Sequence, residues 1–441
     1  MRTSTRLRIA GAALALTLIP AAAAAAAAPG AAAASTAAAA ATTAQPQGID
    51  DGSRFYVPQL QHYQDALRQV AQLTSSGDHQ MAAALRTMIQ TPQAVWLTES
   101  DPKKVEQLAR QVVSRAAGKK EVPVLVAYNV PFRDCAQYSA GGATSTAEYE
   151  AWVDAVARGI GDRRAVVILE PDGLGIIPWY TTINGDREWC QPAEADAATA
   201  ATERFVQLNH AVDALKAGPA TSVYLDGTHS GWLGVGDAAD RLVKAGVERA
   251  DGFFLNVSNY QTTERQLKYG DWISQCIHYG TNPAEGGWRL GHFEYCASQY
   301  YPANPADFST WGLTDAWYAA NVTGAANPPS GPEDLAHFVI DTSRNGQGPW
   351  TPPAGVYPDP QDWCNPPGRG LGARPTTATG DPLADAFLWV KVPGESDGSC
   401  TRGLTTGGGV DPEWGQVDPA AGQWFPEQAV DLIRHAVPPL G

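Results

Sequence analysis

Four short, almost wholly apolar runs each lead into an aspartate, and this arrangement constrains the fold more than any other feature of the chain. The runs are VPVLVAYNV, AVVILEP, SVYL and AFLWVKVPGES, and the aspartates are Asp134, Asp172, Asp226 and Asp397. Runs of this kind, bounded by turn-forming residues, indicate strands buried on both faces of a parallel sheet. In a β/α barrel, the loops after the strands hold the active site. We therefore predict that these carboxyl groups converge on one rim and perform acid–base chemistry.

Strand-like runs alternate with windows of helical periodicity along the chain. The predicted strands are Ala94–Thr98, Pro123–Asn129, Ala165–Glu170, Ser222–Asp226, Gly252–Val257, His337–Asp341 and Ala386–Lys391. Helical spacing occurs in residues 149–160, 205–215 and 430–437. Such alternation predicts an α/β fold with a parallel sheet. Seven repeats with carboxyl groups at the strand ends favour a distorted seven-stranded parallel β/α barrel, similar to a TIM barrel, over an open doubly wound sheet.

Two long stretches interrupt the alternation. One runs from Tyr260 to about His337 and the other from Pro349 to Pro382, and both are rich in aromatic residues, glycine and proline. Loops of this length in a compact domain are usually lids or binding walls. The segment Gly234–Ala239 nominally matches a dinucleotide-binding fingerprint, but it does not directly follow a strand, and we set that function aside.

The first residues have the pattern of a secretory signal peptide. A positive segment, residues 1–8, precedes a mostly apolar stretch, residues 9–19, and an alanine-rich run continues to Ala44. We expect residues 1–44 to be a signal peptide with a low-complexity segment, and residues 45–441 to be a single catalytic domain of a secreted, extracellular protein. No later apolar stretch is long enough to span a bilayer. The net charge of −15 disfavours nucleic acid and anionic membranes as partners.

The six cysteines suggest disulfides, because disulfides persist in exported proteins. Sequence alone does not choose among the possible pairings. Pairing neighbours in chain order, which we favour, would staple three loop regions through Cys135–Cys190, Cys276–Cys296 and Cys364–Cys400. The chain has neither a C-x-x-C nor an H-E-x-x-H pattern, so we expect no metal site and no redox function.

Asp172 has the surroundings expected of a general acid. It follows a deeply apolar strand, and burial together with a neighbouring carboxylate would raise its pKa, as an acid working near neutrality requires. Asp134 is the expected neighbour that holds Asp172 protonated. Taken singly, an aspartate after a strand is more often a helix cap or a turn former. Four of them in an aromatic setting favour glycosidic bond hydrolysis, which uses paired carboxyl groups.

The aromatic content fits a sugar-binding site, because pyranose faces stack on aromatic rings. Of the 14 tryptophans, Trp96, Trp232 and Trp363 stand near strand ends or in a long loop, although core packing is the alternative for any one of them. Tyr128 could contact the sugar at the cleavage point. His229 is expected to be a hydrogen-bonding wall residue and not a metal ligand. The absence of a G-x-S-x-G elbow disfavours a serine hydrolase.

Several motifs together resemble glycoside hydrolase family 6, the cellulases, over nearly all of the chain after the leader. They are YNVPFRDC from Tyr128, VILEPD ending at Asp172, YLDGTHSGW ending at Trp232, NVSNY from Asn256, DTSRNG from Asp341 and WVKVPGESDG from Trp389. The resemblance implies a distorted seven-stranded barrel and inverting cleavage of β-1,4-glucans without a cofactor. The expected partners are cellulose and cello-oligosaccharides, and a monomer is expected.

The resemblance also implies individual roles. Asp172 matches the general acid, Asp134 the carboxylate that raises its pKa, and Asp397 the residue proposed as the base. Tyr128 and Ser139 match contacts near the cleaved bond. The positions that match substrate-binding residues are Trp96, Asp226, His229, Trp232, Asn259, Arg344, Trp363, Lys391 and Glu395.

The long stretch from Tyr260 to His337 and the segment from Cys364 to Cys400 resemble the enclosed, bacterial exo-acting members of the family. We therefore predict a processive cellobiohydrolase that releases cellobiose from non-reducing ends. The alternatives are an endoglucanase on the same fold, a non-catalytic glucan-binding protein, and a retaining glycosidase. Retention and inversion differ in the anomer that is released first.

Overall fold

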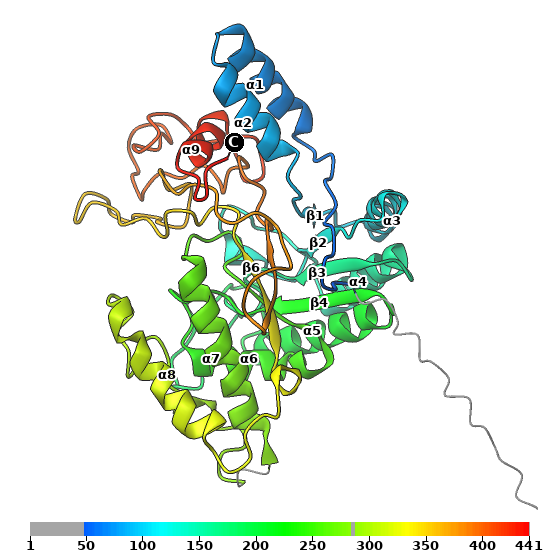
Figure 1. The fold of residues 1–441 in the computed structure, drawn as a ribbon, viewed down its shortest axis with the longest axis vertical. Helices are drawn as coiled ribbons and strands as arrows, with labels where there is room; N and C mark the ends of the chain where they lie inside the picture. Colours follow the sequence, from blue (N-terminus) through cyan, green and yellow to red (C-terminus); the bar gives the residue numbers. More distant parts are fainter. Residues whose placement is uncertain (1–47, 284–286, 441) are drawn as a thin grey trace, which may run out of the picture. The chain divides into compact units, whose positions relative to one another are not determined.

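One parallel sheet organises the fold (Figure 1). The computed structural model describes residues 48–283 and 287–440, which belong to the unit Gln45–Gly441. The strands are hydrogen-bonded in chain order: β1 Val95–Leu97, β2 Val124–Ala127, β3 Ala165–Leu169, β4 Thr221–Asp226, β5 Gly252–Leu255, β6 His337–Asp341 and β7 Ala384–Leu388. Each strand lies within or overlaps a predicted run, and the predicted fold class is confirmed. The predicted signal peptide and alanine-rich segment, residues 1–44, lie outside the described residues.

The sheet forms a distorted barrel because its two edges meet without a full ladder. β1 and β7 share no strand pairing in the described part of the chain. Two hydrogen bonds link their neighbourhoods instead: the Ala94 N–H donates to the Trp389 carbonyl at 3.0 Å, and the Trp96 indole N–H donates to the Val390 carbonyl at 2.9 Å. Trp96 is thereby fixed at the junction of the first and last strands.

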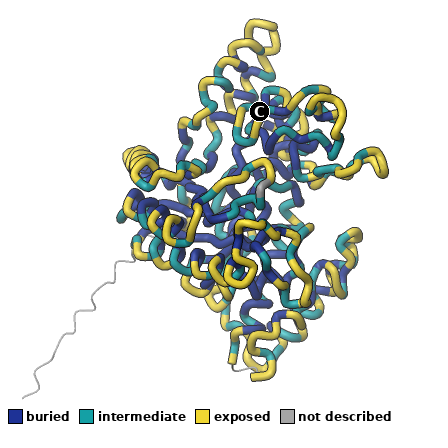
Figure 2. Tube along the Cα trace, turned by 180° about the vertical axis from the view of Figure 1, so that it is seen from behind, coloured by how far each residue is buried: buried dark blue, intermediate teal, exposed yellow. Residues whose placement is uncertain are grey.

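Successive side chains of each strand point to opposite faces of the sheet and so build two separate cores. In β3, Val166 and Ile168 belong to the cluster inside the barrel, whereas Ala165, Val167 and Leu169 belong to the cluster packed under the helices. All five side chains are 0% exposed, as expected for a parallel strand covered on both faces. Figure 2 shows that buried residues gather in the interior and that exposed residues lie along the outer turns of the chain.

The helices connect and cover the strands. Their bounds are α1 Tyr63–Ser75, α2 His79–Ile89, α3 Pro102–Lys119, α4 Thr146–Ile160, α5 Ala200–Lys216, α6 Val235–Lys244, α7 Thr263–Thr281, α8 Gly312–Tyr318 and α9 Pro426–Arg434. The three predicted windows correspond to α4, α5 and α9. The last helix ends before Val437, which is 50% exposed. No helix in the described ranges is both long and apolar enough to cross a membrane.

The stretch from Tyr260 to His337 is not the long loop that its composition suggested. It contains α7 and α8, and α7 buries Tyr269, Trp272, Ile273 and Cys276, which recur at helical spacing. Glycines in α7 obscured this pattern in the sequence. Gly270 is needed there because a Cβ would lie 2.5 Å from a carbon of the Phe338 ring. The expectation of one long loop over this stretch was therefore wrong.

Three disulfides staple the loops, with the pairing favoured from chain order. They are Cys135–Cys190, Cys276–Cys296 and Cys364–Cys400. The first joins the loop after β2 to the long connection between β3 and α5. The third joins the two chain segments on either side of β7. These two bonds act next to residues of the predicted site, whereas the second holds α7 to the segment that follows it.

Candidate active site

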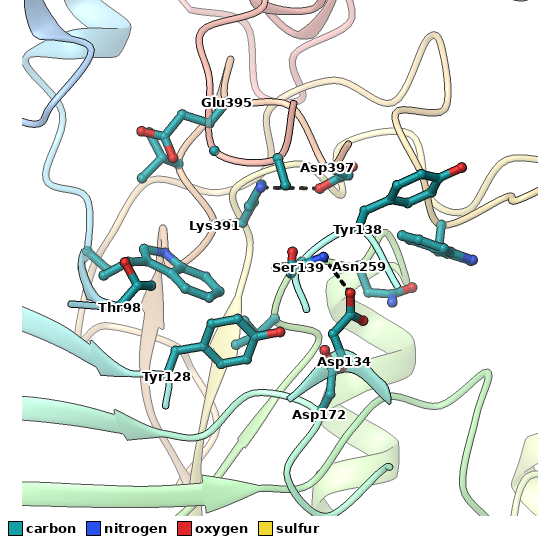
Figure 3. Close-up of a pocket in the computed structure, with 18 of the residues that line it drawn as sticks. Thr98, Tyr128, Asp134, Tyr138, Ser139, Asp172, Asn259, Lys391, Glu395 and Asp397 are labelled. Carbon is teal, nitrogen blue, oxygen red and sulfur yellow. Dashed lines mark hydrogen bonds and ion pairs between the residues drawn. The ribbon is translucent and has the colours of Figure 1, made fainter. Parts of the chain in front are cut away.

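A cleft of about 950 Å³ opens at the carboxyl ends of the strands (Figure 3). The predicted site residues that line it are Trp96, Tyr128, Asp134, Ser139, Asp172, His229, Trp232, Asn259, Trp363, Lys391, Glu395 and Asp397. They come from almost every strand-end loop of the barrel. Asp226 and Arg344 are the two predicted residues that do not line the cleft.

The turn that presents Asp172 has an unusual backbone. Glu170 and Asp172 both have positive φ, +54° and +64°. Such conformations cost of order 1–3 kcal/mol each and persist only where surrounding contacts impose them. Here the buried Arg204 guanidinium donates to the carbonyls of Gly173 at 2.6 Å and Ile176 at 2.9 Å. These bonds hold the turn in the conformation that exposes the Asp172 carboxyl group to the cleft.

Arg204 and Glu170 also join the loop after β2 to the turn after β3. The guanidinium donates to the Pro131 carbonyl at 2.8 Å. The Glu170 carboxylate accepts hydrogen bonds from the N–H groups of Asn129 and Val130 at 2.9–3.0 Å. The two loops that carry the predicted acid and its neighbouring carboxylate are therefore fixed to each other.

Asp172 is suited to hold a proton. Burial raises its pKa well above the usual range, and the negative charges of Asp226 and Asp134 raise it further. A carboxyl group that stays protonated near neutral pH can donate its proton to a leaving oxygen. The sequence pointed only to Asp134 as the neighbour, but Asp226 has the larger effect.

Asp226 is placed behind the cleft and not in its wall. Its side chain is 4% exposed, and its carboxylate accepts hydrogen bonds from the N–H groups of Leu174 at 3.2 Å, Gly175 at 3.1 Å and Thr228 at 2.9 Å. That Asp226 binds substrate stays a prediction. It anchors the Asp172 turn from below and contributes a negative charge to its surroundings.

Asp134 and Tyr128 lie beside Asp172 at the floor of the cleft (Figure 3). The Asp134 carboxylate accepts a hydrogen bond from the Ser139 N–H at 2.6 Å. Burial raises the pKa of Asp134 and outweighs the opposing effects of that hydrogen bond and of Arg133. Burial and the charges of Asp172 and Asp134 also raise the pKa of Tyr128, so its hydroxyl keeps its proton and can donate a hydrogen bond.

We expect Asp134→Asn to shift the alkaline limb of the pH profile of kcat/KM to lower pH. Removing a negative charge makes ionisation of Asp172 easier, so its pKa falls and the protonated form is lost at lower pH. The shift should be roughly half a pH unit to one unit, because burial and Asp226 still act on Asp172. The shift is measured from kcat/KM for cellotetraose hydrolysis between pH 4 and 9, in the variant and in the unchanged protein. Asp162→Asn, at an exposed position, serves as the control, and an unmoved limb in Asp134→Asn would contradict the coupling.

Asp397 is held as an anion by four donors. Its carboxylate pairs with Arg344 at 2.8 Å and Lys391 at 3.3 Å, and it accepts hydrogen bonds from the Tyr260 hydroxyl and the Asn365 N–H, each at 3.0 Å. Burial alone would raise the pKa of Asp397, but Arg344 and Lys391 more than offset burial and lower it to about 2. A carboxylate with this pKa and so many donors is a weak proton acceptor.

Arg344 does not reach the cleft. It is 0% exposed, and its guanidinium donates to Asp397 and, at 2.8 Å, to the Ser258 carbonyl. That Arg344 binds substrate likewise stays a prediction. Its charge is used to hold Asp397 at the cleft, so its effect on a substrate would be indirect.

Aromatic rings form the walls on both sides of the carboxyl groups. Trp96 stands edge-on to Tyr128, with ring centroids 5.2 Å apart, and the Trp363 ring lies 5.9 Å from that of Tyr138. Trp232 rests on the turn after β3 at Gly175, where a Cβ would lie 2.5 Å from the indole. Only glycine allows Trp232 to pack so close to the Asp172 turn.

Burial shifts the pKa values of two further polar wall residues, His229 and Glu395. Burial lowers the pKa of His229 to about 4, so the ring is neutral at neutral pH, and its Nδ1 accepts a hydrogen bond from the Gly231 N–H at 3.1 Å. Burial raises the pKa of Glu395 to about 7 against the opposing charges of Lys391 and His62. A neutral histidine and a readily protonated carboxyl group can both donate to and accept from sugar hydroxyls.

Sequence reasoning missed some residues of the cleft. Trp189, Trp350 and Tyr138 line it, and Trp189 is 54% exposed. A usable signal existed for Trp189, because it adjoins Cys190, whose favoured disulfide partner follows Asp134 directly. Glu170, in the turn after β3, and Arg204, on α5, were also missed, since a buried charged side chain has no marker in a single sequence.

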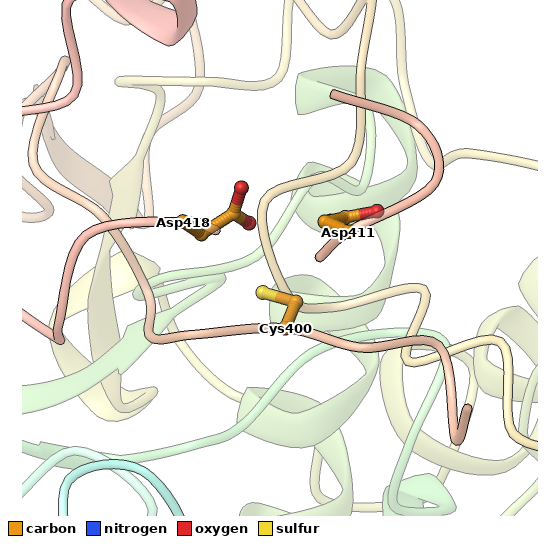
Figure 4. Close-up of side chains that lie close together, drawn as sticks. All are labelled: Cys400, Asp411 and Asp418. Atoms are coloured by element: carbon orange, nitrogen blue, oxygen red, sulfur yellow. The ribbon is translucent and has the colours of Figure 1, made fainter. Parts of the chain in front are cut away.

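A group of possible metal ligands lies beside the site, at Cys400, Asp411 and Asp418 (Figure 4). The Cys400 sulfur is bonded to Cys364, so it offers no thiolate. Asp411 accepts two hydrogen bonds from Arg402, and Asp418 accepts one from the Asn365 side chain at 2.8 Å. These donors make the group an internal polar network that supports the Asp397 loop.

Comparisons with known proteins agree with this geometry. The family model for glycosyl hydrolases family 6 matches residues 51–436. Endoglucanase A of Cellulomonas fimi is 33% identical over 355 residues, which cover 80% of this chain and 56% of that protein, so the chain spans about half the length of this relative. A probable 1,4-beta-D-glucan cellobiohydrolase C of Aspergillus fumigatus is 29% identical over 341 residues, 71% of this chain and 62% of that protein.

A solved structure matches as well. The endoglucanase Cel6 from Mycobacterium tuberculosis, in complex with methyl-cellobiosyl-4-deoxy-4-thio-β-D-cellobioside, is 33% identical, with a TM-score of 0.59 over 87% of this chain and 97% of that one. The family match covers most of the chain, including the barrel and the cleft described above. The chain belongs to family 6 of the glycosyl hydrolases.

Proposed function

We propose that this protein hydrolyses β-1,4-glucosidic bonds of cellulose and cello-oligosaccharides, with inversion at the anomeric carbon. The observation that supports this most is the convergence of a carboxyl group suited to stay protonated, Asp172, with Asp134 and aromatic platforms in one cleft. In this mechanism Asp172 donates its proton to the leaving glycosidic oxygen while water attacks the anomeric carbon from the opposite face. The attacking water releases its own proton to solvent water in the cleft, and Asp172 is then reprotonated from solvent. Asp134 stabilises the positive charge that develops on the sugar.

The proposed role of Asp397 differs from the base role implied by resemblance. Its low pKa and four donors make it a weak acceptor for a proton from water. We propose that it is a positioning residue, which keeps Lys391 at the cleft and ties the segments on both sides of β7 to β6. The proposed chemistry uses carboxyl groups and water, without a cofactor.

For the mode of attack, we propose endo cleavage within the glucan chain. Two observations support it. The relatives with higher identity are endoglucanases. Among its described residues, the stretch from Tyr260 to His337, one of the two segments on which the expectation of an enclosed site depended, contributes only Tyr260 and Gln261 to the cleft. A cleft without that wall can admit the middle of a long chain.

Processive cellobiohydrolase action is the second candidate, favoured by one contact. The Gln361 side chain donates to the Tyr138 hydroxyl at 3.3 Å, beside the packing of Tyr138 on Trp363. Loops after β2 and before β7 therefore meet next to the carboxyl groups. Loops that meet there could restrict sideways entry of a chain, as a tunnel does.

Viscosity of carboxymethylcellulose separates these two modes. We expect the viscosity to fall steeply while few reducing ends have formed, because internal cuts shorten long chains most. Simultaneous measurement of reducing ends gives the comparison, with Asp172→Asn as the inactive control. A slow, proportional fall with cellobiose as the dominant product from cellulose would instead establish exo action.

Secretion is part of the proposal. The three disulfides fit an oxidising compartment, and the residues before the described domain have the sequence pattern of an export signal. A monomer is still our prediction for the oligomeric state. The non-catalytic alternative is disfavoured because a glucan-binding protein would not need a carboxyl group built to stay protonated.

A further inference from the structure

Two consecutive tyrosines stand exposed just beyond the cleft. Tyr300 is 44% exposed and Tyr301 is 80% exposed, whereas Tyr269 and Tyr318, on the helices around them in sequence, are buried. Neither exposed ring lines the cleft itself. Large aromatic side chains in neighbouring exposed positions are unusual unless they contact a ligand or a partner.

The turn that carries these tyrosines is fixed to the loop that carries Trp232. Gln299 is 0% exposed, and its side-chain amide donates to the carbonyls of Ser230 at 3.0 Å and Leu233 at 2.9 Å. The Tyr300 hydroxyl donates to the carbonyl of Trp232 itself at 2.9 Å. Tyr300 is therefore held against the main chain of the loop that presents Trp232 to the cleft.

The hydrogen bond of Tyr300 leaves its ring available. Its hydroxyl is satisfied by a main-chain carbonyl, so the polar end of the side chain is fixed while part of the ring faces solvent. A fixed ring of this kind is a stacking surface for the apolar face of a pyranose, at low entropic cost. A glucan chain longer than the cleft would have further glucosyl units to place along such a surface.

We propose that Tyr300, with Tyr301, forms an additional stacking subsite for a β-1,4-glucan chain where the chain leaves the cleft past Trp232. This inference rests on the proposed function, because it takes the same polysaccharide as ligand. It predicts that these rings contribute only when the substrate is long enough to extend beyond Trp232.

The test compares substrates of different length. We expect the double variant Tyr300→Ala/Tyr301→Ala to hydrolyse cellotriose like the unchanged enzyme. Its kcat/KM on cellohexaose and its rate on swollen cellulose should fall roughly 2- to 10-fold, the effect of losing an aromatic stacking contact. Tyr295→Ala is the matched control, because Tyr295 is 51% exposed and its ring packs beside His292 and Trp288; it should change neither the kcat/KM on cellohexaose nor the rate on swollen cellulose.

A second variant separates stacking from anchoring. Tyr300→Phe keeps the ring but loses the hydrogen bond to Trp232, so it should keep the preference for long substrates. If Tyr300→Phe lost that preference as the double variant does, the tyrosine would act through the loop, and the stacking subsite would be overturned. If the ratio of kcat/KM on cellohexaose to the activity on cellotriose were unchanged in the double variant, the subsite would be overturned as well. Failure of the unchanged enzyme to cleave any cello-oligosaccharide would instead refute the proposed function, and the subsite with it.

Discussion

Asp172→Asn should reduce kcat/KM on cellotetraose by about 10³-fold or more, at the upper range of what general acid catalysis contributes. The amide has the shape of the carboxyl group but cannot deliver a proton to the leaving oxygen. Binding should survive, because the aromatic walls and the hydrogen bonds that hold the turn do not depend on that proton. Quenching of tryptophan fluorescence by cellotetraose measures the binding that remains.

A substrate with a dinitrophenolate leaving group distinguishes loss of the acid from a general defect. That leaving group departs without protonation, so Asp172→Asn should lose much less activity on a dinitrophenyl cello-oligosaccharide than on cellotetraose. The control Asp213→Asn, at an exposed position, should behave like the unchanged enzyme on both. Equal losses on the two substrates would remove Asp172 from the role of acid.

Asp397→Ala should lower the free energy of unfolding by about 3–5 kcal/mol, because it leaves a buried guanidinium without its counter-ion. Arg344 is 0% exposed, and Lys391 is 8% exposed and also loses its partner. Urea unfolding with the disulfides intact measures the change. Asp213→Ala, which breaks the exposed pair with Arg249, should cost less than about 1 kcal/mol.

The same ion pair predicts how stability depends on pH. The pKa of Asp397 is lowered from 3.8 to about 2 in the folded protein. A carboxylate with a depressed pKa stabilises the fold above its unfolded pKa and loses this effect as the pH falls through the folded value. Its contribution should therefore be fully present above pH 4 and decline towards pH 2. Asp397→Ala should flatten this part of the acid unfolding curve.

Chemical rescue tests the positioning role of Asp397 against the role of base. In Asp397→Ala the missing side chain leaves space for a small anion. If Asp397 were the base, added formate could accept the proton from water and restore part of the activity. We expect no such rescue at temperatures where the variant is folded, because what is lost is the arrangement of Arg344 and Lys391.

Much of the fold could be predicted because its signals are local. Each strand of the barrel is a run such as AVVIL in β3, and α4 shows its buried face at helical spacing in Tyr149, Trp152 and Val156. The failure to predict α7 also had a local cause. In α7, Gly270 and Gly280 lie on the buried face where aromatic rings from elsewhere need their space, so the usual apolar periodicity was interrupted.

The candidate site could be predicted as a set of positions, but the roles within the set could not. The strand ends of a barrel meet at one rim, so Asp134, Asp172 and Asp397 were expected together, and all three line the cleft. Asp226 ends β4 and Arg344 comes shortly after β6, yet both side chains are buried and bond to protein partners.

By itself, the sequence determined the order and approximate positions of the strands and the rim on which the carboxyl groups gather. These follow from apolar periodicity and chain order, which are properties of short segments. Only the tertiary structure decided which carboxyl group keeps its proton and which is tied up as an anion. That outcome depends on burial and on donors within about 3 Å, and these donors come from segments far apart in the chain.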